Sequence, residues 1–172
     1  MKIKYIGILA VLAAGMLTCP LSVGAQEVIF IVRHSDPPAV LNLDEIKDET
    51  PLSESGQQRA RRLAEQLKDA GITAIYATQA RRTVETAQPL AKAIGIEIRI
   101  HSYEDTNGLV HRLRSEHAGD RVLVVGHWST IPEILKALGY RQEVQIERSA
   151  YDNLFVVIPN EAAAPTVLHF HY

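Results

Sequence analysis

The sequence predicts an α/β fold in three layers: a mostly parallel sheet with helices on both faces and a hairpin at its C-terminal edge. Residues 28–32 and 122–125 are unbroken apolar runs rich in Val and Ile, which is typical of strands buried on both faces. From residue 53 onward, segments with helical periodicity alternate with short strands. Such alternation favours parallel strands that are connected by helices packed on the sheet.

The expected elements follow from their apolar patterns and from the residues that begin and end them. Strands are expected at residues 28–32, 74–77, 96–100, 122–125, 153–158 and 166–170, the last two joined as the hairpin. Helices are expected from Ser53 or Ser55 to Gly71, from Val84 to Gly95, from Asn107 to Gly119 and from Thr130 to Leu138. Ser, Thr and Asn are preferred helix caps, Glu133 would complete a capping box with Thr130, and Gly often follows the last turn. Pro89 is expected to kink the second helix.

The N-terminus has the order of residues that is typical of a secretory signal. Lys2 and Lys4 precede an apolar run over residues 5–17, and the small residues Val23-Gly24-Ala25 follow. We therefore expect a signal peptide over residues 1–25 and a single domain over residues 26–172, located in the periplasm or outside the cell. The apolar run is too short to cross a bilayer comfortably, so no stable membrane span is expected after cleavage.

Composition excludes several classes of function. Cys19 is the only cysteine and lies within the expected leader, so disulfides, thiol catalysis and cysteine–zinc sites are excluded from the mature chain. An uncleaved anchor or a lipid on Cys19 is the alternative to simple cleavage. Acidic residues outnumber basic ones, 20 to 18, and there is no basic cluster. Nucleic acid is therefore a poor candidate partner.

Two histidines follow the two most apolar strands. His34 comes after residues 28–32 within an Arg33-His34 pair, and His127 comes after residues 122–125 within a Gly126-His127 pair. In open parallel sheets, ligands bind beyond the carboxyl ends of the strands. Two residues that are far apart in the sequence thus become candidates for one site.

These pairs belong to an ordered set of four motifs. The other two are Leu52-Ser53-Glu54-Ser55-Gly56 at a helix start and Arg82-Thr83-Val84-Glu85-Thr86-Ala87 in the next helix. Together the four resemble the histidine phosphatase superfamily, also called phosphoglycerate mutase-like. That family has an Arg-His pair after its first strand, a Leu-Ser/Thr-x-x-Gly helix start, an Arg-x-x-x-Thr-Ala helix and a late Gly-His. The resemblance covers essentially the whole chain after the expected leader, which would make this a small exported member.

The resemblance implies a role for each of these residues. His34 would be the nucleophile that becomes phosphorylated, and Arg33, Arg82 and His127 would surround the phosphate oxygens. Arg82 is preferred over Arg81 because the family's arginine lies four residues before the threonine of its Thr-Ala pair. Fixed cationic donors suit this chemistry, since phosphoryl transfer spreads negative charge over three oxygens. No cofactor and no metal are implied.

The resemblance is weaker for the two residues that follow the nucleophile, and it leaves more than one candidate for the general acid. The family often continues as Arg-His-Gly-Glu or Arg-His-Ala-Glu, whereas this chain has Ser35 and Asp36. Ser35 is small enough for the loop to approach the phosphate closely, and we expect it to contact substrate. By resemblance the general acid is Glu104, in a Glu-x-x-x-Gly stretch, with Asp105 and Asp36 as alternatives. A carboxyl group in that role works best with a raised pKa.

The implied function is hydrolysis of phosphomonoesters through a phosphohistidine on His34, outside the cytoplasm. The substrate would be a phosphorylated small molecule, an envelope component or a protein. A phosphomutase is one alternative, although mutases usually have longer segments over the pocket. A non-catalytic module of the same fold that binds phospholigands is another.

The remaining histidines and the polar and aromatic residues near the motifs are expected to have mainly structural roles. Five further histidines match no compact zinc motif and are expected at the surface or in packing: His101, His111, His117, His169 and His171. Ser129 lacks the second glycine of a hydrolase nucleophile elbow. Trp128 is expected to pack or to wall the pocket, and Tyr151 to support the site loops.

Overall fold

A computed structural model describes residues 27–39, 47–160 and 162–172. The expected signal peptide lies outside these residues. The strands are β1 (Val28–Arg33), β2 (Ala74–Thr78), β3 (Ile98–His101), β4 (Arg121–Gly126), β5 (Asn153–Ile158) and β6 (Thr166–His171). The helices are α1 (Glu54–Leu67), α2 (Arg81–Ile94), α3 (Thr106–Glu116) and α4 (Thr130–Ala137). No helix of this part of the chain is long and apolar enough to cross a membrane.

The strands form one six-stranded sheet in the order β3-β2-β4-β1-β5-β6. β3, β2, β4 and β1 are parallel to one another, while β5 pairs antiparallel with β1 and β6 antiparallel with β5. The predicted parallel sheet and the C-terminal edge hairpin are therefore both confirmed. β1 and β4 are neighbours, and Arg33 pairs with Gly126, so the ends of the two most apolar strands lie side by side.

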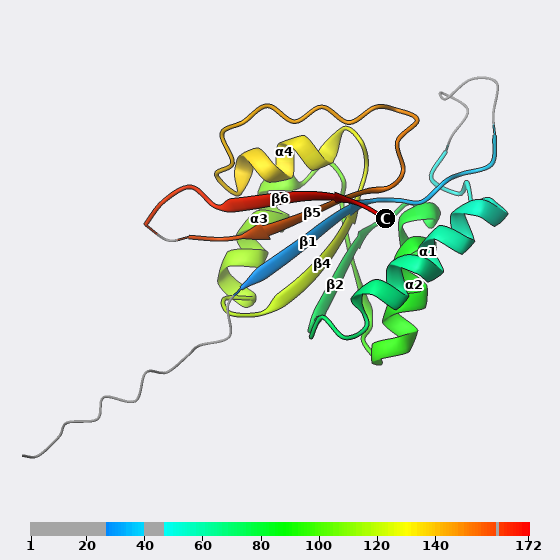
Figure 1. Ribbon diagram of the computed structural model, residues 1–172, viewed down its shortest axis with the longest axis horizontal. Coiled ribbons are helices and arrows are strands. Elements are labelled where there is room, and N and C mark those ends of the chain that lie inside the picture. The colour runs from blue at the N-terminus through cyan, green and yellow to red at the C-terminus, as the bar shows by residue number, and fades with distance from the viewer. Residues whose placement is uncertain (1–26, 40–46, 161) are drawn as a thin grey trace, which may run out of the picture.

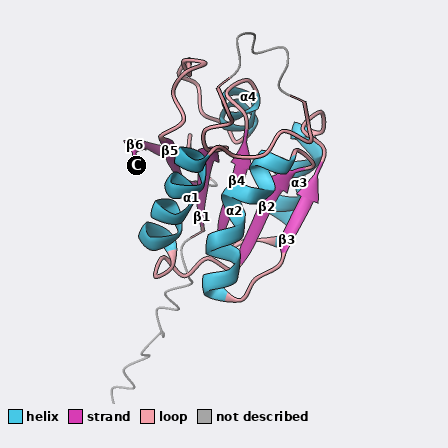
Figure 2. Ribbon diagram, turned by 90° about the vertical axis from the view of Figure 1, so that its right-hand side faces the viewer, coloured by secondary structure: helices cyan, strands magenta, loops and turns pink. Residues whose placement is uncertain are grey.

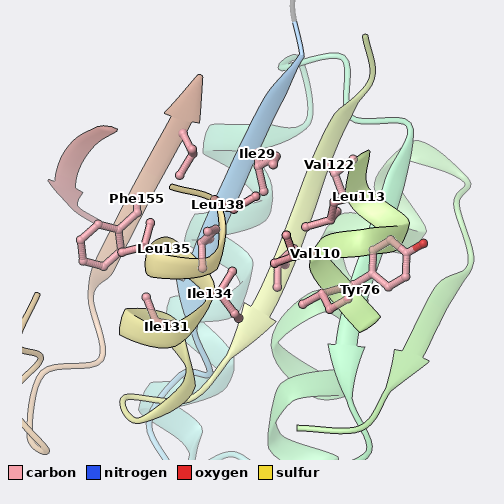
Figure 3. Packing of buried hydrophobic residues seen from close by; sticks show 14 of the residues in the cluster. Ile29, Tyr76, Val110, Leu113, Val122, Ile131, Ile134, Leu135, Leu138 and Phe155 are labelled. Carbon is pink, nitrogen blue, oxygen red and sulfur yellow. The ribbon is translucent and has the colours of Figure 1, made fainter. Parts of the chain in front are cut away.

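Helices cover both faces of the sheet, as predicted. α1 and α2 lie on one face, and α3 and α4 lie on the other (Figures 1 and 2). Successive residues of a strand point to opposite faces, and β4 shows the consequence. Val122 and Val124 pack with α3 and α4 (Figure 3), whereas Leu123 and Val125 pack with α1 and α2. All four are fully buried, which explains the unbroken apolar run in the sequence.

The helix starts correct two of the sequence predictions. Ser53 caps α1, and its hydroxyl accepts a hydrogen bond from Gly56 N at 3.0 Å. α3 is capped by Asp105 and not by Asn107. The capping box of Thr130 and Glu133 is also wrong, because α4 begins at Thr130 without a side-chain cap. The Thr130 hydroxyl instead accepts the backbone N–H of His127 at 3.0 Å, so it holds the loop that carries this histidine. α2 runs unbroken through Pro89.

Candidate active site

A cavity of about 330 Å³ lies beyond the carboxyl ends of the central strands β1, β4 and β2. Of the residues that the structure describes, ten line it: Arg33, His34, Asp48, Arg82, Tyr103, His127, Trp128, Ser129, Thr130 and Arg148. Three of these carry guanidinium groups and one carries a carboxylate, so the lining has an excess of positive charge. The structure therefore brings His34, Arg33, Arg82 and His127 together from three separate parts of the chain.

His34 is positioned through both its backbone and its ring. Its N–H donates to the carbonyl of Gly126 at 3.0 Å, which ties the residue after β1 to the end of β4. Ring atom Nδ1 lies 2.8 Å from the Ser35 carbonyl, and a carbonyl can only accept, so Nδ1 carries the proton. Burial is the main cause that holds the pKa of His34 well below its ordinary value, helped by His127, Arg82 and Arg33. The ring is therefore neutral, with its Nε2 lone pair unprotonated.

Thr86 connects the loop after His34 to α2. Its hydroxyl accepts the Ser35 backbone N–H at 2.9 Å and donates to the Arg82 carbonyl at 2.7 Å. These two bonds explain why a threonine four residues after Arg82 belongs to this arrangement. Ser35 itself is fully buried and does not line the cavity. Its contribution to the site thus comes from its main chain, and the predicted contact of Ser35 with substrate has no support in its placement.

Arg33 is held rigidly at the end of β1. Its Nη1 donates to the carbonyls of Glu147 and Ala150 at 3.1 and 2.8 Å. Its guanidinium carbon lies 3.8 Å from the centre of the Tyr151 ring, a cation–π contact. Tyr151 also stands 5.7 Å, ring to ring, from His34. Tyr151 therefore supports both residues, which agrees with the structural role expected for it.

Arg82 reaches the cavity from the first turn of α2. Its Nη1 donates to the Lys47 carbonyl at 2.9 Å, and its Nη2 donates to His127 Nδ1 at 3.4 Å. Arg81 faces away from the cavity and pairs with Glu85 at 2.6 Å. Burial lowers the pKa of both Arg82 and Arg33, but arginine stays charged in proteins.

Both of these arginines keep an unused donor. The Nε atoms of Arg33 and Arg82 are buried and have no hydrogen-bond partner within the described part of the chain. A buried cationic N–H without a partner costs free energy. An oxyanion in the cavity would remove that cost by accepting from both groups.

His127 sits opposite His34, with 5.3 Å between the ring centres. Because Nδ1 accepts from Arg82, its proton lies on Nε2, which donates to the Thr78 hydroxyl at 2.9 Å. Burial and then the charges of Arg82 and Arg33 lower the pKa of His127 to about 3. His127 is therefore neutral in the ligand-free pocket. A bound dianion would favour its protonated form, because an opposite charge raises the pKa of a histidine.

Comparison with known proteins finds a family that resembles this chain in sequence. A family model for the histidine phosphatase superfamily, branch 1, matches residues 29–103. Over these 75 of its 172 residues the chain is similar to this superfamily. The match runs from the second residue of β1 to the second residue after β3 and so includes Arg33, His34 and Arg82. No protein of curated function matches the chain in sequence.

Solved structures of several phosphatases share the fold. The protein histidine phosphatase SixA, complexed with tungstate, has a TM-score of 0.67 and 18% identity, over 84% of this chain and 96% of that one. A mycobacterial glucosyl-3-phosphoglycerate phosphatase has a TM-score of 0.67 and 14% identity, over 84% and 97%. A phosphoserine phosphatase of Entamoeba histolytica, in complex with phosphoserine, has a TM-score of 0.64 and 15% identity, over 84% and 96%. At these identities the likeness concerns the fold alone.

The carboxyl groups that the superfamily resemblance suggested as general acids lie elsewhere. Glu104 and Asp105 line a separate hollow beside Glu133 and Lys136. The Asp105 carboxylate accepts the backbone N–H of Gly108 at 2.9 Å as the cap of α3. Asp36 is paired with Arg59 at 2.6 Å. None of the three lines the cavity, so their predicted role has no support in their placement.

Several lining residues were not predicted from the superfamily motifs. Asp48, Tyr103 and Arg148 border the cavity, and the Arg148 guanidinium lies 4.5 Å above the Trp128 ring. Trp128 thus does line the pocket. Asp48 and Arg148 come from segments before α1 and after α4 that carry many charged residues. Nothing in the sequence sets these two apart from their charged neighbours.

The remaining histidines make local contacts. His117 is buried between the Tyr76 hydroxyl, at 3.0 Å, and Asp120, at 2.8 Å. His169 stacks on Phe155, with ring centres 4.2 Å apart. No group of three or more His, Cys, Asp or Glu side chains that could hold a metal occurs in residues 27–39, 47–160 and 162–172.

Proposed function

We propose that this chain is a phosphomonoester hydrolase that works through a phosphohistidine on His34. The observation that supports this most directly is the hydrogen bond from His34 Nδ1 to the Ser35 carbonyl, at 2.8 Å. That bond leaves the Nε2 lone pair free to attack phosphorus. Because the pKa of His34 lies well below its ordinary value, the ring stays neutral and nucleophilic at physiological pH.

The cationic lining suits a transferring phosphoryl group. Catalysis of this reaction depends almost entirely on positioning and on electrostatic stabilisation. Arg33 and Arg82 approach His34 from two different elements, β1 and α2, and each keeps a buried Nε–H available for an oxygen. The Nη1 atom of each guanidinium is fixed to backbone carbonyls, and Arg82 Nη2 also donates to His127 Nδ1. The two guanidinium groups are thus set in place before the substrate arrives.

The reaction would proceed in two steps. In the first, the bond between His34 Nε2 and phosphorus forms while the bond from phosphorus to the leaving oxygen breaks. In the second, water attacks phosphorus, the bond to Nε2 breaks, and its electron pair returns to the ring as inorganic phosphate departs. His127 would take up a proton as the dianion binds and then donate it in a hydrogen bond to a phosphate oxygen.

A His34→Ala variant tests the proposal. We expect its hydrolysis of p-nitrophenyl phosphate to fall by about 10³-fold or more, because the nucleophile is lost. Acid-labile phosphate should be recovered on the quenched wild-type protein and not on the variant. His111→Ala is the matched control, since His111 is exposed on α3 and does not line the cavity.

Other outcomes identify the alternatives. Full activity of His34→Ala would refute the nucleophile. Phosphate binding without turnover by the wild type would indicate a binding module. Transfer of the phosphoryl group to a second metabolite, in preference to water, would indicate a mutase.

We propose a substrate outside the cytoplasm: a phosphorylated small molecule, an envelope component or a protein. The signal-like order of residues 1–25 supports the location. Structural neighbours named for protein histidine phosphatase and phosphoserine phosphatase activities support both small and protein substrates. Mass spectrometry of the exported protein should find an N-terminus at Gln26. A cytoplasmic protein that retains Met1 would contradict the location, and a screen of phosphorylated metabolites and phosphoproteins would select the substrate.

A further inference from the structure

We propose that Asp48 is the general acid of this reaction, a proposal that rests on the phosphohistidine chemistry above. Asp48 is the one carboxylate among the described residues that line the cavity. Its carboxyl group would protonate the leaving oxygen in the first step. As a carboxylate it would take a proton from the attacking water in the second.

The turn that carries Asp48 is held at both of its ends. Thr50 N donates to the Lys47 carbonyl at 3.1 Å, and Lys47 N donates to the Thr50 hydroxyl at 3.0 Å. These bonds close a four-residue turn with Asp48 at its second position. The side chain is thereby presented from a fixed loop and not from a free segment.

The same turn is attached to the start of α2. The Asp48 carbonyl accepts the backbone N–H of Arg81 at 2.7 Å, and the neighbouring carbonyl of Lys47 accepts Arg82 Nη1 at 2.9 Å. Arg82 therefore contacts both the phosphate region and the turn. Asp48 is positioned relative to the phosphoryl group by the arginine that would bind that group. Acid catalysis requires such placement, since the proton must move to an oxygen attached to phosphorus.

Other groups near the cavity are poorer proton donors. The Nε2–H of His127 is engaged by the Thr78 hydroxyl, and the proton taken up when the dianion binds would stay in a hydrogen bond to a phosphate oxygen. A tyrosine such as Tyr103 is ordinarily a much weaker acid than a carboxyl group. The Asp36 carboxylate pairs with Arg59 at 2.6 Å and does not line the cavity.

The proton balance is complete with Asp48. In the first step His34 Nε2 bonds to phosphorus, the leaving oxygen takes the electron pair of the broken bond, and the Asp48 proton converts it to an alcohol. In the second step a water proton passes to the Asp48 carboxylate, the hydroxyl bonds to phosphorus, and the bond from phosphorus to His34 Nε2 breaks with its electron pair returning to the ring. Phosphate is released, and both residues return to their starting states.

Leaving-group dependence tests this role. p-Nitrophenolate is a good leaving group that departs without a proton, whereas the serine alkoxide of O-phosphoserine departs only with one. For Asp48→Asn we expect kcat/KM on phosphoserine to fall by about 10²–10⁴-fold, the usual contribution of general acid–base catalysis. The loss on p-nitrophenyl phosphate should be at least ten times smaller. Glu49→Gln is the matched control, because Glu49 is exposed on the same turn and does not line the cavity.

Several results would contradict the role proposed for Asp48. Equal losses of Asp48→Asn on both substrates would overturn the proposal. So would a selective loss in Glu104→Gln, or a wild type that hydrolyses only the aryl ester. If His34→Ala keeps its activity, the proposed function itself is wrong. If His34→Ala is inactive but Asp48→Asn loses no more activity on phosphoserine than on p-nitrophenyl phosphate, only the role proposed for Asp48 is wrong.

Discussion

The hydroxyl of Thr86 should be necessary for both stability and activity. Thr86 and Ser35 are fully buried, and the Thr86 hydroxyl accepts the Ser35 N–H at 2.9 Å. Thr86→Val keeps the shape of the side chain and removes the acceptor. An unsatisfied buried N–H costs about 1–3 kcal/mol. For a domain of this size, a loss of about 2 kcal/mol lowers the melting temperature by roughly 4–8 °C.

Calorimetry together with p-nitrophenyl phosphate turnover would measure both effects. Thr86→Ser retains the hydroxyl and should recover most of the stability and turnover. Thr73→Val makes the same chemical change at an exposed threonine, where we expect a change within about 0.5 kcal/mol. The reasoning would be refuted if Thr86→Val were as stable and active as Thr73→Val.

Three further predictions concern the same region. Folding lowers the pKa values of His34 and His127. The free energy of unfolding should therefore be highest above about pH 6.5. It should decrease as the pH is lowered, by up to about 1.4 kcal/mol per pH unit for each histidine, since the unfolded state then binds more protons. Urea unfolding between pH 7.5 and 5 would measure this slope, and His127→Gln should reduce it. Gly56→Ala should destabilise by about 1–3 kcal/mol, because a Cβ at that position would collide with the Asp36 carbonyl; an unchanged unfolding midpoint would contradict the close approach. Arg82→Lys should weaken inhibition by phosphate about 10–100-fold, because the charge remains while the planar set of donors is lost; an unchanged inhibition constant would exclude Arg82 from phosphate binding.

The sequence predicted the architecture and the meeting of the two histidines. The apolar runs of β1 and β4 could be assigned without knowledge of their neighbours, because both faces of each strand are covered. The rule that ligands bind at the carboxyl ends of parallel strands then brought His34 and His127 to one edge of the sheet. Their proximity follows from the pairing of Arg33 with Gly126 in adjacent strands.

Local starts and ends were less predictable because backbone and side-chain groups compete for the same partners. Ile96 was assigned to a strand by its alternating pattern, but its N–H donates to the Ala91 carbonyl and completes the end of α2. β3 consequently begins only at Ile98. Gly95 makes this possible by adopting φ +71°, a conformation that glycine tolerates well. Thr130 likewise holds the His127 loop and so does not cap its helix.

The acidic residue of the cavity could not be identified from the sequence. Motif spacing suggested Glu104, but after β3 the chain places this residue in a different hollow. Asp48 enters the cavity through contacts of its main chain with Arg81 and Arg82, which belong to another element. Placement of this kind depends on tertiary hydrogen bonds, and no local pattern records it.

The two buried guanidinium Nε–H groups, which have no partner among the described residues, also bear on the end of the proposed catalytic cycle. Inorganic phosphate would offer them the same oxygens as the substrate, so the product would compete for the pocket in which it forms. We expect turnover to slow as phosphate accumulates and to be fastest where free phosphate is scarce. Feedback of this kind needs no separate regulatory site, because the affinity that captures the ester also retains the reaction product.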